Sequence, residues 1–257
     1  TAKSDIDTDI PQTQRVQENT FVVILANQNY SDFVAPYAIN DGVVVKEYCS
    51  QTLGIPAANI MYYEDATLNN IQSAVLRLND LADAYEGDAS IIVYFAGQGA
   101  VDKQSRPYLL PSDADIDMIH ATAYPVQSLY DQLGSLNVRS AIVFLDCSFS
   151  GYNRNAKPIQ PHLTAPKKSV PATVKGNLTV FMAASSGETS FSDEENGHGI
   201  FTYHLCKKIK ESKGDLTIGN LAESVVSQVG GSSMQLTGKK QNVIVIYSNP
   251  NNKKTLL

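Results

Sequence analysis

The sequence contains no tryptophan, three cysteines and four histidines. The cysteines, Cys49, Cys147 and Cys206, lie far apart, and an odd number without a Cys-x-x-Cys pair argues against a disulfide framework and against a zinc site. The histidines form neither a HExxH nor a HxxxH pair. The acidic run DADID at 113–117 lacks the Gly and Glu that an EF-hand loop requires, so we expect a solvated loop there. No metal and no other cofactor is expected.

Long apolar runs and an excess of positive charge are also missing. No apolar run approaches the ~20 residues of a membrane helix, and 26 acidic against 20 basic residues give a net charge of −6. We therefore expect neither a membrane span nor a basic face for nucleic acid. The 257 residues allow one large domain or two small ones, since domains average roughly 150 residues.

Strand patterns alternate with helix patterns along the chain. Short segments that are apolar at nearly every position predict six buried strands, at 21–26, 60–63, 91–95, 141–145, 179–183 and 243–247. Strands that are apolar on both faces are typical of a mainly parallel sheet with helices on both sides. Helical spacing predicts a helix at 68–85 after the N-cap Thr67, and further helices at 43–53, 126–133, 201–209 and 218–229. The pattern predicts an α/β doubly wound domain.

The segment 152–176 differs from the rest, because it has four prolines and five basic residues but no acidic residue. This composition predicts a long exposed loop between a larger first part and a smaller second part. The second part has too few strands to fold alone, so we expect one domain at 20–248. A polar N-terminal tail (1–19) and a C-terminal tail (249–257) flank it.

Two predicted strands end in polar turns that contain glycine. The strand at 91–95 runs into AGQG at 96–99, and the strand at 141–145 runs into DCSFSG at 146–151. Ligands of open α/β sheets bind outside the carboxyl ends of the strands. These two turns are therefore the candidate functional site.

The turns resemble those of the caspase and metacaspase-like cysteine peptidases, most closely the bacterial members. In that family the first turn reads Tyr-Phe-Ser-Gly-His-Gly and the second Asp-Ala-Cys-Phe-Ser-Gly or Asp-Cys-Cys-His-Ser-Gly. The similarity runs from about residue 20 to 248 and includes AIND at 38–41, YLLPSD at 108–113 and GHGIFTY at 197–203. It implies the α/β caspase-like (caspase-hemoglobinase) fold, with a mainly parallel six-stranded sheet and helices on both faces.

The two positions of the catalytic dyad depart from the family. Gln98 stands where the family has its general-base His, and Ser148 stands where it has its nucleophilic Cys. Cys147 comes one residue early and matches the non-nucleophilic first Cys of the metacaspase motif. An amide cannot accept a proton, and a serine hydroxyl needs a base to attack. Loss of one such group typically costs ~10⁴ to 10⁶ in rate, so the resemblance implies a pseudopeptidase.

Three interpretations remain open. The protein is a non-catalytic binding or regulatory module, an Arg/Lys-specific peptidase with residual or rescued activity through Cys147 or a serine-based site, or a peptidase inactivated by engineering at positions 98 and 148. In an extended segment Cys147 points away from Ser148, so we expect a buried, unreactive thiol. His198 follows the nucleophile turn and no apolar strand precedes it, so we interpret it as a loop residue.

The resemblance also assigns substrate-binding positions. Asp41 and Asp146 match residues that, in the metacaspase-like branch, line an acidic pocket for the Arg or Lys before the cut bond. Gly99 is expected to offer a backbone N–H to a carbonyl, as an oxyanion donor does. From the residues alone, Asp41 is equally explained by a helix N-terminus and Asp146 by a strand-end turn. The partner expected is a protein or peptide segment carrying Arg or Lys, or an active homologue. Bacterial relatives are often exported, and the compartment of this chain stays open.

Overall fold

A six-stranded sheet forms the centre of the computed structural model, which describes residues 4–159 and 167–257. Its order is β11-β8-β7-β3-β1-β2, and each pair of neighbours is parallel except β11 and β8. The strands are β1 (Thr20–Ala26), β2 (Ile60–Glu64), β3 (Ser90–Ala96), β7 (Ser140–Asp146), β8 (Leu178–Met182) and β11 (Ile244–Tyr247). All six predicted strands and the mainly parallel sheet are confirmed.

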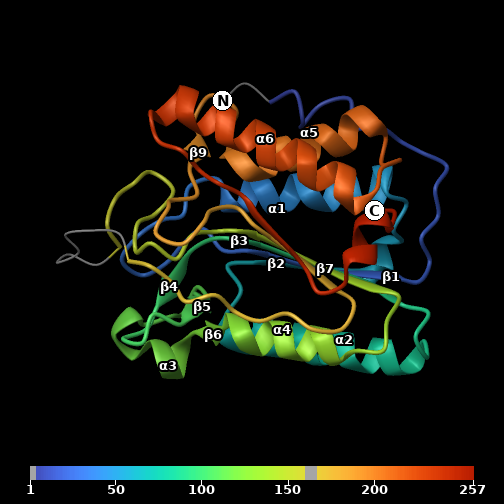
Figure 1. Ribbon diagram of the computed structural model, residues 1–257, viewed down its shortest axis with the longest axis horizontal. Coiled ribbons are helices and arrows are strands. Elements are labelled where there is room, and N and C mark those ends of the chain that lie inside the picture. Colours follow the sequence, from blue (N-terminus) through green and yellow to red (C-terminus); the bar gives the residue numbers. More distant parts are fainter. Residues whose placement is uncertain (1–3, 160–166) are drawn as a thin grey trace.

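Helices cover both faces of this sheet, as predicted (Figure 1). On one face lie α1 (Ala38–Glu47), α5 (Ile200–Ser212) and α6 (Ile218–Thr237), and on the other lie α2 (Leu68–Ala84) and α4 (Val126–Ser135). The first helix begins five residues before the predicted start at 43. It continues into a π-helical turn at Tyr48–Thr52.

The start of α2 shows how local sequence sets an element. The Thr67 hydroxyl accepts a hydrogen bond from the Asn70 backbone N–H, and the Asn70 side chain accepts one from the Thr67 backbone N–H. This capping box satisfies two backbone donors that a helix start otherwise leaves unpaired. Ile71, Val75 and Leu78 then recur on the buried face of the helix.

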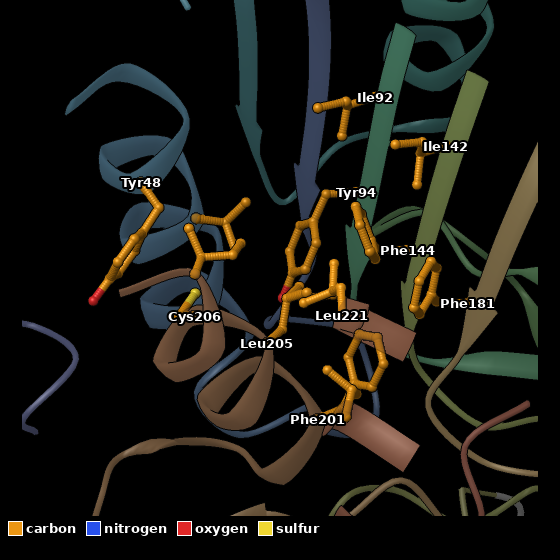
Figure 2. Packing of buried hydrophobic residues seen from close by; sticks show 14 of the residues in the cluster. Tyr48, Ile92, Tyr94, Ile142, Phe144, Phe181, Phe201, Leu205, Cys206 and Leu221 are labelled. Carbon is orange, nitrogen blue, oxygen red and sulfur yellow. The ribbon is translucent and has the colours of Figure 1, made fainter. Parts of the chain in front are cut away.

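The core on the α1, α5 and α6 side contains an aromatic row across the sheet. Figure 2 shows Tyr94, Phe144 and Phe181 along this row, with Leu205 of α5 packed against it. The rings of Phe144 and Phe181 are 4.9 Å apart between centroids. The Tyr94 hydroxyl is fully buried and lies 2.5 Å from the hydroxyl of Thr202. The apolar layer thus leads into a polar network near the carboxyl ends of the strands.

Several short elements were not predicted. They are a small antiparallel sheet of β4 (Gly99–Val101), β5 (Pro107–Leu109) and β6 (Tyr124–Pro125), a pair formed by β9 (Ser192–Asp193) and β10 (His198–Gly199), the helix α3 (Ile119–Thr122), and 3₁₀ turns at Ala57–Asn59, Ile116–Met118 and Pro250–Lys254. Two to five residues are too few to show a hydrophobic period. Partners distant in sequence decide such elements.

Residues 4–19, which precede β1, make specific contacts with the domain. Ile6 is fully buried, and its carbonyl oxygen accepts a hydrogen bond from the Tyr48 hydroxyl at 3.0 Å. The Thr52 hydroxyl donates to the Pro11 carbonyl at 2.8 Å. This segment therefore packs on the π-helical turn after α1. No helix in the described part of the chain combines the length and apolarity that a membrane span requires.

The predicted loop at 152–176 is irregular wherever the structure describes it, since no helix or named strand lies between β7 and β8 there. Residues 160–166, including His162, lie outside the described residues. The prediction that the whole loop is exposed is wrong for its first part. Arg154 is only 2% exposed, because its side chain is inserted into the body of the protein.

Candidate functional site

The two polar turns lie side by side because β3 and β7 are neighbouring parallel strands. Ala96 at the end of β3 pairs with Asp146 at the end of β7. Beyond the strands, the Gly97 N–H donates to the Asp146 carbonyl at 3.3 Å. The topology therefore brings the two dyad-equivalent positions together, as the sequence predicted from the strand ends.

The Gln98 side chain is a buried donor to the backbone. Its amide nitrogen donates to the carbonyl oxygens of Gly99 (2.9 Å), Ser148 (3.3 Å) and Tyr152 (3.1 Å). Only 1% of the residue is exposed. A buried amide that satisfies three carbonyl groups holds the two turns together. It cannot take a proton from a neighbouring hydroxyl.

Ser148 is buried, and no base lies beside it among the residues that the structure describes. Its Oγ lies 3.4 Å from Ser150 Oγ and 3.5 Å from the Tyr152 carbonyl oxygen. Neither neighbour removes a proton at ordinary pH. The next residue back, Cys147, lies in the opposite core with a fully buried thiol. Burial, followed by the charge of Asp146, raises the pKa of this thiol far above its usual range, so no thiolate forms.

Gly99 does not present a free oxyanion donor. Its N–H donates to the carbonyl oxygen of Ser148 at 3.2 Å, which is one of several hydrogen bonds between the two turns. The ring of Phe149 also lies where a Cβ at position 99 would be, so a side chain there would collide with that ring. The Gly99 N–H is therefore already hydrogen-bonded and is not available to a substrate carbonyl in this arrangement.

Asp41 and Asp146 do come together, and the guanidinium group of Arg154 lies between them. Arg154 Nη1 donates to Asp41 Oδ2 at 2.5 Å and to the Pro36 carbonyl at 3.1 Å. Its Nη2 donates to the Asp146 carbonyl at 2.9 Å and lies 3.2 Å from Asp146 Oδ1. We call Asp41, Asp146 and Arg154 the ion cluster. All three side chains are at most 1% exposed.

Both carboxylates have further partners in this cluster. Asp146 accepts hydrogen bonds from the hydroxyls of Ser190 (2.8 Å) and Thr202 (2.5 Å). Asp41 accepts from the backbone N–H of Gly199 at 3.0 Å. Only glycine fits at position 199, since a Cβ there would collide with Asp146 and approach Asp41 Oδ2 to 3.1 Å. The acidic pair is therefore a built site for a guanidinium group.

Burial and charge act against each other in the ion cluster. Burial raises the pKa of Asp146, Arg154 lowers it and Asp41 raises it, and the net direction is upward. Burial would lower the pKa of Arg154, but the carboxylates of Asp146 and Asp41 outweigh it and raise that pKa. The guanidinium thus stays charged. It provides the charge that compensates both carboxylates.

The prediction that His198 is a loop residue is wrong. It lies in β10, is 1% exposed, and bridges two carboxylates, with Nδ1 2.9 Å from Asp41 Oδ1 and Nε2 3.0 Å from Asp7 Oδ1. Burial would lower the pKa of His198, whereas the hydrogen bond and charge of Asp41, followed by those of Asp7, raise it. His198 therefore ties the segment before β1 to the ion cluster.

Arg154 and His198 are the site residues that the sequence did not reveal. In the sequence, Arg154 is one of five basic residues of a Pro-rich segment, and no neighbouring residue marks a buried side chain. The Gly-His-Gly sequence at 197–199 is visible in the chain, but the contact of His198 with Asp41 spans 157 positions. Within the described residues, no group of three or more His, Cys, Asp or Glu side chains is placed to hold a metal ion.

Comparison with known proteins adds three findings. A family model described as "Caspase domain" matches residues 19–255. A paracaspase from Dictyostelium discoideum is 24% identical over 213 residues, which cover 80% of this chain and 48% of that protein. The chain thus spans about half the length of this relative. Caspase-1 from Spodoptera frugiperda has a similar fold, with a TM-score of 0.64 at 13% identity over 94% of this chain and 91% of that one.

Proposed function

The chain belongs to the caspase domain family, and within that family we propose that it is a member without peptidase activity, which acts as a binding or regulatory module. One observation carries this proposal: Gln98 and Ser148, at the positions of the catalytic dyad, are both buried and hydrogen-bonded to the same carbonyl, that of Tyr152. Gln98 cannot act as a general base, and residues 4–159 and 167–257 place no other base beside Ser148.

The chemistry of the site supports the proposal. Peptide hydrolysis in this family requires a thiolate and a group that moves protons, and the site offers a hydroxyl and an amide. Loss of either partner typically costs ~10⁴ to 10⁶ in rate. Rescue through Cys147 would need an accessible thiol of low pKa, whereas this thiol is buried and its pKa is raised.

The binding role is supported by the acidic pair. Asp41 and Asp146 hold a guanidinium group in this fold, which is the chemistry of an arginine side chain. The partner we propose is a protein segment with Arg or Lys, or an active homologue that presents one. Such a module would act by binding and releasing a partner protein rather than by cleaving it.

A peptidase assay tests the proposal. The purified protein is incubated with reporter peptides that end in Arg, Lys or Asp, with and without calcium, and we expect no turnover above background. The Gln98→His, Ser148→Cys double variant is assayed beside it. Turnover gained by that variant would assign the missing activity to the two substituted positions.

Two matched variants separate the alternatives. Activity of the unmodified protein that survives repurification and disappears in Ser148→Ala would mean a serine-based peptidase. Activity that instead disappears in Cys147→Ala would mean rescue by the neighbouring thiol. Either result would refute the proposal.

A further inference from the structure

We propose that Arg154 is a built-in ligand of the acidic pocket, which closes the pocket to basic side chains of other chains as long as the turn at 151–159 stays in place. The inference rests on the proposed function in one respect: because the protein has no peptidase activity, it does not cleave its own turn at 151–159. The pocket then serves to fasten this turn, and a partner's arginine enters only when the turn is displaced.

The guanidinium of Arg154 occupies the hydrogen-bond acceptors of the pocket. Its two terminal nitrogens contact Asp41, Asp146 and the carbonyl oxygen of Pro36. Only Nε lacks a partner among the described residues. An external guanidinium would need the same oxygens, and the arginine side chain is 1% exposed. Both groups cannot occupy the site together.

The turn that presents Arg154 is held in shape by Asn153. The Asn153 N–H donates to the Lys157 carbonyl at 2.8 Å, while its side-chain oxygen accepts from the backbone N–H groups of Asn155 (3.1 Å) and Lys157 (3.0 Å). Its side-chain nitrogen donates to the Val34 carbonyl at 3.2 Å. Asparagine commonly stabilises tight turns in this way. Arg154 therefore projects from a preorganised tip rather than from a loose loop.

The same turn covers the dyad-equivalent positions. Its Tyr152 carbonyl oxygen lies 3.1 Å from the Gln98 amide nitrogen and 3.5 Å from Ser148 Oγ. On its other side, the Arg154 carbonyl accepts from the Ser192 N–H at 3.3 Å. One short segment thus closes both the dyad positions and the acidic pocket. Removing one side chain from it should open the pocket without removing the fold around it.

A surface hollow with several acidic residues lies next to Arg154. The hollow has a volume of about 450 Å³, and its charged lining residues besides Arg154 are Asp193, Glu194, Glu195 and one basic residue, Lys239, which the acidic ones outnumber. Three acidic side chains at its edge attract cations at neutral pH. In an Arg154→Ala variant, Asp41 and Asp146 lose their guanidinium while their oxygens keep their hydrogen-bond donors. This leaves a space with the charge and shape for a guanidinium ion.

The test compares Arg154→Ala with Lys157→Ala, which changes an exposed basic residue of the same turn. Each protein is titrated with acetyl-arginine amide and with its neutral citrulline analogue by calorimetry. We expect Arg154→Ala to bind the arginine probe with a Kd of ~10 μM to 1 mM, and at least tenfold more tightly than the unmodified protein or Lys157→Ala. Adding Asp146→Asn to Arg154→Ala should abolish the binding.

Three results would overturn the proposal: equal binding of the arginine probe by the unmodified protein and by Arg154→Ala, equal binding of arginine and citrulline, or no binding by folded Arg154→Ala. If that variant does not fold, NMR of the unmodified protein decides. We expect separate, slowly exchanging Nη signals for Arg154, assigned by their loss in Arg154→Lys. Signals averaged like those of exposed arginines would refute a resident ligand. None of these measurements depends on peptidase turnover, so failure here is distinguishable from failure of the proposed function.

Discussion

Replacing Arg154 by methionine should destabilise the protein more than any change of an exposed charge. Methionine keeps much of the side-chain volume and removes the charge, so Asp41 and Asp146 stay buried without their common partner. Breaking a buried ion pair on one side typically costs about 3–5 kcal/mol. For a chain of this size, 1 kcal/mol shifts the melting temperature by about 2–4 °C. The expected loss is therefore about 6–20 °C.

The pH dependence of this loss has a defined sign. The pKa of Asp146 is already raised by burial, and removal of Arg154 takes away the lowering contribution. A carboxyl group whose pKa is higher in the folded than in the unfolded protein, where it is roughly 3.9, stabilises the fold in its protonated form, and this stabilisation is fully present at a pH below roughly 3.9. This contribution disappears as the pH rises through the folded pKa. The deficit of Arg154→Met should consequently grow from pH 4 upward.

Urea unfolding followed by circular dichroism is the assay, because guanidinium chloride would supply an ion that fits the emptied pocket. Arg77→Met, an exposed arginine of α2, is the control and should change stability by less than about 0.5 kcal/mol. Combining Arg154→Met with Asp146→Asn should cost less than the sum of the single changes, with a coupling of about 0.5–3 kcal/mol. Additive effects, or an Arg154→Met cost as small as the control, would refute the reasoning.

Two further predictions concern the segments that meet at the ion cluster. Asp41 and then Asp7 raise the pKa of His198, so the contribution of Asp7 to the free energy of unfolding should be fully present below pH ~6.5 and decline as the pH rises above it. Urea unfolding of Asp7→Asn and of the unmodified protein at pH 5.5 and 8.5 checks this. A stability difference between the two proteins that is the same at both pH values would contradict it. The purified protein should stay uncut on storage. Trypsin should cleave the 152–176 loop after the exposed Lys168 or Lys175 earlier in time than after the buried Arg154. Cleavage after Arg154 as the first event, detected by mass spectrometry, would contradict a turn that stays closed.

Most of the architecture can be predicted from the sequence, because each central strand is recognisable by itself. Each is apolar along its whole length, and a helix pattern or a turn separates it from the next, so the six strands are predictable to within one residue at each end. The five helices are predictable as elements, but α1 begins five residues before its predicted start and α6 ends eight residues after its predicted end. The order of polar turns after β3 and β7 also predicted where the dyad-equivalent residues meet. Local chemistry fixed the start of α2, through the capping box of Thr67 and Asn70.

What occupies the pocket was decided only by tertiary structure. Asp41 and Asp146 are recognisable as a pair through the family resemblance, but their ligand, Arg154, lies in an irregular loop 113 positions from Asp41. A loop has no period that tells a buried arginine from an exposed one, and its composition predicted exposure. The burial follows from an Asn153 turn that aims one side chain at two carboxylates brought together by α1 and β7. Such a match of charge and shape exists only after the chain has folded.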